Sequence, residues 1–290
     1  MDQSNITDII IESINTIFYQ LLSSIDNNLY SILDELAFIN SDILNDSNLE
    51  KIFGTSASNG LLLIANALLL GIILYFSIRY LLSHITYSKI ESPSQFIFKL
   101  IIFGICMNFS YFLVNYFLDL MCNISLAIRN IGENIFNKNI CFSELINIIN
   151  SNISIDTSST NIFSLDGIIK STLTLSLLNL VFSYSFRYIM IKIFVLLSPF
   201  AVLSLSLNST SWFFKSWIKN LFSLLFIQII ISLDLLILFS VDYSSANLLT
   251  EFIYIGGIYG LIKANSFVKE FIGSISTTIS QNVNNFMNFK

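Results

Sequence analysis

Long apolar blocks separated by short polar patches dominate residues 168–242. The helices that this pattern predicts are apolar on nearly every side, whereas a helix of a soluble domain carries a single apolar stripe. A bilayer core about 30 Å thick needs roughly 20 apolar residues per crossing, so this block has room for three crossings. We therefore expect a membrane protein and interpret the rest of the chain relative to a bilayer.

Two earlier segments, 60–82 and 96–121, are also apolar and long enough for one crossing each. The connection between them has more basic than acidic residues once Lys99 is included, so the positive-inside rule predicts that it is cytoplasmic. Residues 1–59 and the long connection 122–167 are then expected outside, where they could pack together.

The N-terminal part is acidic and amphipathic. Residues 1–50 contain nine Asp and Glu and no Lys or Arg. Across residues 8–39 apolar side chains recur at steps of three or four, which is the helix period. Because anionic headgroups repel an acidic helix, we expect its apolar stripe to pack on another protein helix, in this chain or a neighbouring one. A helical hairpin that turns near residues 26–28 is an equally good interpretation. The polar stretch 40–58 predicts a linker.

Two charges, Arg187 and Lys192, interrupt the apolar sequence that starts at residue 168. The next apolar run, 193–207, is only 15 residues long and contains Pro199. Proline inside a helix costs about 3 kcal/mol unless a kink or partner compensates. The run is therefore either a kinked full crossing or a re-entrant hairpin, which is tolerated only against protein or a cavity. The charge pattern slightly favours re-entry, because that topology keeps the following basic residues in the cytoplasm: Arg187, Lys192, Lys215, Lys219, Lys263 and Lys269.

Two more apolar segments follow, at 217–241 and 248–264. Tryptophans are enriched at membrane interfaces, and small residues four apart permit close contact between helices. Trp212 and Trp217 therefore predict a membrane interface at the start of the first segment. Gly256 and Gly260 predict a close helix contact in the second.

These patterns predict an all-α fold: a polytopic transmembrane helical bundle with five to six membrane segments and an amphipathic acidic N-terminal helical region. The expected parts are the acidic region 1–59, the first two transmembrane helices 60–121, an extracytoplasmic loop 122–167, a C-terminal transmembrane cluster 168–264 and an amphipathic tail 265–290.

In each of the two early crossings the polar side chains lie on one face of that helix. They are Asn66 in the first crossing, and Asn108, Asn115 and Asp119 in the second. Polar groups in hydrocarbon are costly unless they are paired or hydrated. This face therefore either lines a water-filled path or forms hydrogen bonds between helices, and we favour the second interpretation for the asparagines. Asp119 is close enough to the boundary to be solvated.

Asp234 is the one carboxylate well inside a predicted span, and Gln228 lies on another face of the same helix. An ionisable residue in a membrane is a candidate for function, although a structural pair with Arg187 or Lys192 explains it equally well. The candidates for path-lining or interface positions are thus Asn66, Asn108, Asn115, Asp119, Arg187, Lys192, Pro199, Gln228, Asp234, Gly256 and Gly260.

Composition excludes most soluble and enzymatic classes. The chain is 54% hydrophobic and 11% charged, with a mean hydropathy of +0.74, whereas a soluble domain is about a quarter charged. It contains no phosphate-binding loop, no dinucleotide fingerprint and no zinc-protease or serine-hydrolase motif. Cys106, Cys122 and Cys141 are too far apart for a metal knuckle. We expect no enzyme activity, no metal and no cofactor, and an ATP-driven role would need a partner that supplies the motor.

The series Arg187, Ser198-Pro199-Phe200-Ala201, Trp212, Trp217 and Gln228 resembles the TrbL-type family, the polytopic inner-membrane subunit of type IV secretion and conjugation systems. The tail segments Gly260–Ala264 and Phe271–Gly273 are similar to that family as well, although many members have a proline near the position of Asn265. The acidic N-terminal helices followed by Asn59-Gly60-Leu61 resemble versions from Gram-positive mobile elements. The resemblance covers about residues 60–275.

The resemblance implies a channel or scaffold subunit in the bacterial cytoplasmic membrane, and the charge pattern described above predicts that its N-terminus is outside. Such a subunit is expected to form homo-oligomers within lipid, to work with ATPases and other secretion subunits, and to contact nucleic acid or protein substrates transiently. The alternative is a membrane subunit of a small-molecule transporter or permease. That class shows inverted repeats with paired broken helices, but the broken segment at Pro199 has no counterpart in the first half.

Overall fold

The computed structural model describes residues 12–13, 16, 32–54, 59–86, 92–152, 165–241 and 248–272. All regular elements within these ranges are helices, which confirms the all-α class. Four of them are long and apolar enough to cross a membrane: α3 (Gly60–Thr86), α5 (Ser110–Phe136), α7 (Leu165–Leu203) and α8 (Ser211–Phe239). The apolar helix α4 (Pro93–Asn108) and the apolar part of α9 (Leu248–Ile272) are shorter.

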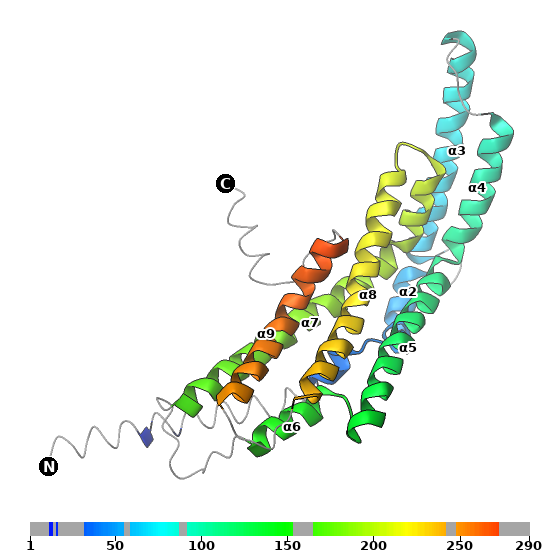
Figure 1. Cartoon of the computed structure of the whole chain (residues 1–290). Helices are drawn as coiled ribbons and strands as arrows, with labels where there is room; N and C mark the ends of the chain where they lie inside the picture. The colour runs from blue at the N-terminus through cyan, green and yellow to red at the C-terminus, as the bar shows by residue number, and fades with distance from the viewer. Residues whose placement is uncertain are drawn as a thin grey trace, which may run out of the picture.

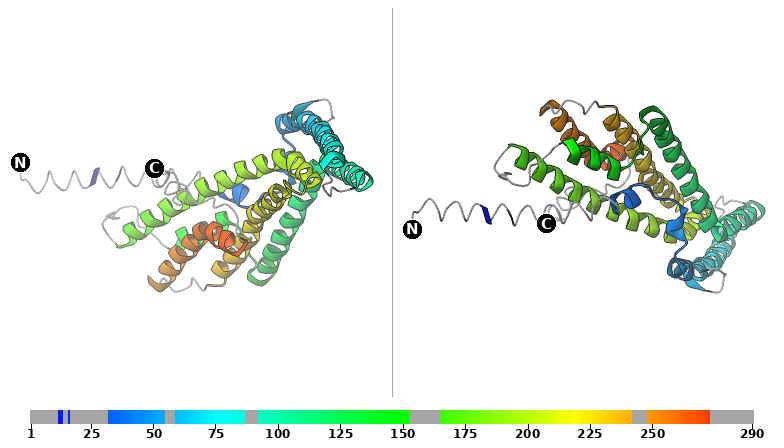
Figure 2. Two further views of the ribbon diagram at one scale, coloured as in Figure 1. Left: turned by 90° about the horizontal axis from the view of Figure 1, so that it is seen from above. Right: turned by 90° about the horizontal axis from the view of Figure 1, so that it is seen from below.

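Helix α8 is the central helix of the molecule and packs against α5, α7 and α9. Of the residues in the most apolar part of α8, 61% are buried inside the molecule, whereas in α3 only 17% are. Helices α3 and α4 form an antiparallel hairpin that projects beyond the turn between α7 and α8 (Figure 1). Viewed along the vertical axis, α5, α7 and α8 converge toward the hairpin and fan out away from it (Figure 2).

The expected crossing 96–121 is wrong as a single helix. It is divided at Phe109 into α4 and α5, and α5 continues to Phe136, 15 residues beyond the expected end. At the break the amide of Asn108 donates to the carbonyl oxygen of Gly104, and the Ser110 hydroxyl donates to that of Met107. Side chains that bond nearby carbonyls compete with the helical ladder. The first part of the predicted loop 122–167 is thus helical, and it also contains a second helix, α6 (Phe142–Asn152).

The segments 168–186 and 193–207 are not separate helices. They form one continuous helix, α7, with Arg187, Lys192 and Pro199 inside it. At a rise of 1.5 Å per residue its 39 residues span about 58 Å, roughly twice a bilayer core. The chain reverses after the short 3₁₀ helix η2 (Ser204–Ser206), so the turn lies at residues 207–210, beyond Pro199.

The N-terminal strap, residues 32–54, runs across the bundle to the base of α3. The stretch 40–58, expected to be a linker, instead contains η1 (Ser41–Leu44) and α2 (Ser47–Phe53). Both begin at side-chain caps: Asn40 accepts from the backbone N–H of Asp42, and Asp46 accepts from that of Asn48. The strap's apolar side chains enter the core, as expected for an amphipathic segment that packs on protein: Leu33, Ala37, Ile39, Ile43, Leu44 and Leu49.

Several expectations lie outside the described residues. These are the amphipathic pattern over most of 8–31, its turn near 26–28, the remainder of the connection at 153–164 and the tail from residue 273 onward. Residues 265–272, predicted to belong to the tail, continue α9 to Ile272.

Candidate functional site

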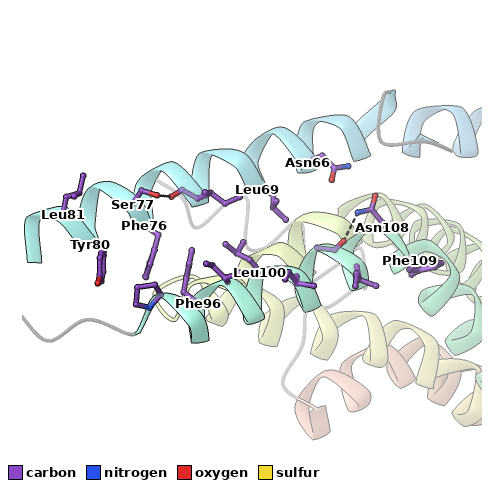
Figure 3. Close-up of a pocket in the computed structure, with 16 residues that line it drawn as sticks. Asn66, Leu69, Phe76, Ser77, Tyr80, Leu81, Phe96, Leu100, Asn108 and Phe109 are labelled. Carbon is purple, nitrogen blue, oxygen red and sulfur yellow. Dashed lines mark hydrogen bonds between the residues drawn. The ribbon is translucent and has the colours of Figure 1, made fainter.

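A groove between α3 and α4 brings together two of the predicted residues, Asn66 and Asn108, at one of its ends (Figure 3). It has a volume of about 870 Å³. The rings of Phe76 and Phe96 stack across it with their centroids 3.6 Å apart. Asn66 donates to the carbonyl oxygen of Leu62 at 2.9 Å, and Asn108 bonds Gly104 at 2.8 Å. Both amides thus bond within their own helices, so these contacts are not the interhelical bonds that we favoured.

Asn115 and Asp119 do not line this groove. The break at Phe109 separates them from Asn108, and both are half-buried on α5. The spacing predicted one polar face only for a continuous helix. Because the helix is divided at Phe109, Asn108 and the pair Asn115 and Asp119 do not form that face.

Arg187 is the most deeply buried charged residue in the described part of the chain, with 0% of its surface exposed. Its Nη2 donates to the carbonyl oxygens of Leu36 at 2.9 Å and Ala37 at 2.7 Å, both in the strap. Its guanidinium carbon lies 5.2 Å from the ring centroid of Tyr184, one turn earlier on α7. A guanidinium buried in this way requires partners, so Arg187 fixes the strap to the middle of α7.

Further contacts bind the strap to other helices. Lys192 of α7 forms an ion pair with Asp46 at 3.2 Å, and the Tyr111 hydroxyl of α5 donates to the carbonyl oxygen of Leu44 at 2.6 Å. The guanidinium of Arg129, also on α5, lies 3.9 Å from the ring centroid of Phe38. The strap thus joins α5 to α7.

Asp34 connects the strap to α6. Its carboxylate accepts hydrogen bonds from the backbone N–H groups of Phe142 at 2.7 Å and Ser143 at 3.1 Å, and from the Ser143 hydroxyl. Unpaired N–H groups and the helix dipole favour an anion at a helix N-terminus. This contact confirms that part of the N-terminal region packs against the connection 122–167.

The pair Lys192–Asp46 corrects the expected topology. The charge rule placed residues 1–59 outside and Lys192 in the cytoplasm, but a 3.2 Å ion pair requires both side chains at the same level. Arg187, which bonds the strap directly, leads to the same conclusion. The charge rule is applied to each loop separately and does not consider contacts across the fold. It could therefore assign the strap and Lys192, which are in contact, to opposite sides of the membrane.

The Lys192–Asp46 contact predicts a pH dependence. The N–H of Asn48 and then the Lys192 ammonium hold the pKa of Asp46 below its ordinary value of 3.8. A carboxyl with a lowered pKa stabilises the fold above its ordinary pKa, and the contribution is lost as the pH falls through the lowered value. We expect Asp46→Asn to remove this part of the acid dependence. Thermal unfolding in detergent between about pH 5 and pH 3 should shift less in the variant than in the wild type, and equal shifts would contradict the assignment.

Asp234 and Gln228 lie on different contact faces of α8. Asp234 faces α9, where its Oδ2 is 4.0 Å from the position that a Cβ on Gly260 would take. Of the two interpretations of Asp234, the structural pair with Arg187 or Lys192 is not observed, because both cations bind the strap. Gln228 is 1% exposed, and its backbone carbonyl oxygen accepts a hydrogen bond from the Ser232 hydroxyl at 2.9 Å. Ser232 is in turn 2.6 Å from the Ser125 hydroxyl, which connects α8 to α5.

The predicted glycine contact of α9 is made by a neighbouring residue. A Cβ on Gly256 would meet nothing within 4 Å, whereas one on Gly257 would lie 2.4 Å from Leu238 Cδ2 of α8. The close contact with α8 is therefore at Gly257, while Gly256 and Gly260 are both exposed.

This difference makes Gly256 a matched control. We expect Gly257→Ala to destabilise the protein by about 1–3 kcal/mol, the usual cost of overpacking, because Leu238 must move. Gly256→Ala should leave the unfolding temperature in detergent unchanged or raise it slightly. Equal effects of the two substitutions would contradict this packing.

The α7–α8 hairpin is joined by polar contacts that hydropathy does not reveal. Trp217, expected at an interface, is only 6% exposed and donates from Nε1 to the carbonyl oxygen of Phe194 at 2.8 Å. Trp212 is 66% exposed. Pro199 is buried, and the preceding Ser198 donates to the Ser110 hydroxyl at 3.1 Å, which joins α7 to the start of α5.

The sequence analysis missed Asp34, Asp46 and Tyr111 as contact residues. Asp46 was detectable, because Asp before a Ser-x-x-Glu sequence is a helix-start pattern. Tyr111 carried no local signal. Together with Arg187 and Lys192, these residues form a clamp that holds the strap against α5, α6 and α7. Within the described ranges no three or more His, Cys, Asp or Glu lie close enough together to hold a metal ion.

No protein-family model, curated protein or solved structure matches this chain.

Proposed function

We propose that this chain is an integral membrane channel or scaffold subunit of a type IV secretion system for conjugative transfer, at the bacterial cytoplasmic membrane. In this role it helps DNA or protein substrate to cross the membrane, while partner subunits supply ATP hydrolysis. Four apolar helices long enough to cross a membrane are compatible with this role.

The observation that carries the proposal is the position of the residues that resemble the TrbL-type family. The main series, from Arg187 to Gln228, lies in one unit, the α7–α8 hairpin, and several of its residues form contacts between elements. Arg187 binds the strap, Ser198 binds α5, Trp217 binds α7, and Gln228 lies at the contact with α5 through Ser232 and Ser125. Because these residues hold helices together, their presence supports a scaffold whose function depends on its shape and not on a catalytic group.

Deletion of the chain from its host tests the proposal. We expect conjugative transfer to be lost and to be restored by the wild-type chain, with growth and membrane integrity unchanged. The purified protein should form a homo-oligomer in detergent. Normal transfer combined with defective uptake of a small solute would instead support the transporter alternative.

A further inference from the structure

Helix α9 has an outer side that no described part of the chain covers. The helix lies at the edge of the bundle, where it packs on α7 and α8 (Figure 2). On its outer side Phe252, Tyr259 and Phe267 are each more than half exposed. They recur at steps of seven and eight residues, so they follow one stripe along the helix, and Gly260 and Lys263 are exposed on the same stripe. We call these five residues the α9 face. Its rings require lipid or another protein around them.

Two opposite charges lie beside the α9 face, and neither is paired within the described ranges. The Oδ2 atom of Asp234 is buried next to Gly260, and no donor there bonds it. Lys263 follows Gly260 by three positions, which is about 4.5 Å along the helix. Its ammonium lies 5.4 Å from the ring centroid of Tyr259. A buried carboxylate without a partner and an ammonium group among apolar side chains are both unfavourable, so each of these charges favours a partner of opposite sign.

A second copy of the chain carries the missing partner of each charge. Copies that share one orientation in a membrane are related by an axis along the membrane normal, so their α9 helices run parallel and equal residues lie at the same level. Because Asp234 lies beside Gly260, Lys263 of one copy is then within about 4.5 Å of the level of Asp234 in the other. Gly260 has no side chain that would keep the two helices apart.

We propose that the α9 face is the contact between two copies of this chain, in which Lys263 of each copy forms an ion pair with Asp234 of the other. The contact is isologous, so the same pair is formed twice. This inference rests on the proposed function for the expectation that copies associate, and it identifies the surface and the charges that join them. The competing arrangement is an ion pair between Lys263 and Asp234 of a single copy.

Exchange of charges between two differently tagged full-length chains tests the contact. We would co-express the two chains and measure how much of one co-purifies with the other in mild detergent. We expect Lys263→Glu in both chains to reduce co-purification about tenfold, because two carboxylates then oppose each other at each contact. Asp234→Lys in both chains should do the same with two ammonium groups. One chain with Lys263→Glu and the other with Asp234→Lys should associate again, because each contact regains opposite charges.

Two further variants keep the test decisive. Lys219→Glu reverses another exposed lysine, 15 residues before Asp234 on α8, and should leave co-purification unchanged. Asp234 is half-buried, so Asp234→Asn is the substitute if Asp234→Lys does not accumulate. Added to Lys263→Glu, it removes one of the two opposed carboxylates, and association should recover in part.

The inference is overturned if wild-type copies do not associate, if Lys263→Glu weakens association no more than Lys219→Glu does, or if neither the mixed pair nor Asp234→Asn restores it. An ion pair within one copy predicts the last result, because mixing two chains cannot repair it. The transfer assay separates these results from failure of the proposed function. Any of them, combined with loss of transfer on deletion of the chain, rejects only the α9 contact. Restored association in the mixed pair, combined with normal transfer on deletion, rejects only the secretion role.

Discussion

Replacing Arg187 with alanine is expected to release the N-terminal strap from the bundle. The substitution leaves the carbonyl oxygens of Leu36 and Ala37 without their donor, at about 1–3 kcal/mol each. It also opens a cavity beside Tyr184, because the Arg187 side chain is fully buried. The cost falls on one segment, so we expect local detachment of the strap before global unfolding.

Limited trypsin digestion measures this release. Lys51 in α2 is the first basic residue of the chain and Arg79 is the next, so cleavage at Lys51 yields a diagnostic N-terminal fragment. We expect cleavage at Lys51 to be faster in Arg187→Ala than in the wild type. Arg79→Ala, which removes an exposed arginine on α3, is the matched control and should not change the rate. Unchanged cleavage in Arg187→Ala would refute the clamp.

Gly54→Ala is expected to have the second large effect, at the junction between the strap and α3. Gly54 has a φ of +98°, which side-chain-bearing residues rarely adopt, and such strain costs of order 1–3 kcal/mol. A Cβ would also lie 2.1 Å from the carbonyl oxygen of Asn59, which is a backbone atom that cannot rotate away. The junction must therefore open.

The control for Gly54 is Gly71→Ala in the middle of α3. A Cβ there would meet nothing within 4 Å, and alanine is favoured over glycine in a helix. We expect Gly54→Ala to lower the unfolding temperature in detergent and to speed cleavage at Lys51. Gly71→Ala should do neither. Equal behaviour of the two variants would show that the junction does not constrain the strap.

Local sequence predicts the helices whose signal is continuous. Helices α3 and α8 were expected close to their observed positions, because uninterrupted apolar residues determine both. The break at Phe109 could not be predicted this way, because Phe109 is apolar and its neighbours fit a crossing. Side-chain bonds of Asn108 and Ser110 to nearby carbonyls accompany the break, and hydropathy does not measure them.

The two cations of α7 show the same limit of prediction from local sequence. Arg187 and Lys192 were identified because they interrupt an apolar run, but their partners were not. Those partners are two backbone carbonyls and Asp46, which lie 146–151 residues away in the sequence. The separation of acidic and basic residues along the chain was the available signal, and we interpreted it as two compartments instead of as a contact.

The strap's contacts also impose an order on synthesis. Arg187 is made 150 residues after Ala37, so the strap has no guanidinium to bind while α3, α4 and α5 are being produced. At about 5–20 residues per second this delay lasts roughly 8–30 s. Tyr111 of α5 and Ser143 of α6 are made before Arg187, so the strap can contact these two helices first and is fixed to α7 last.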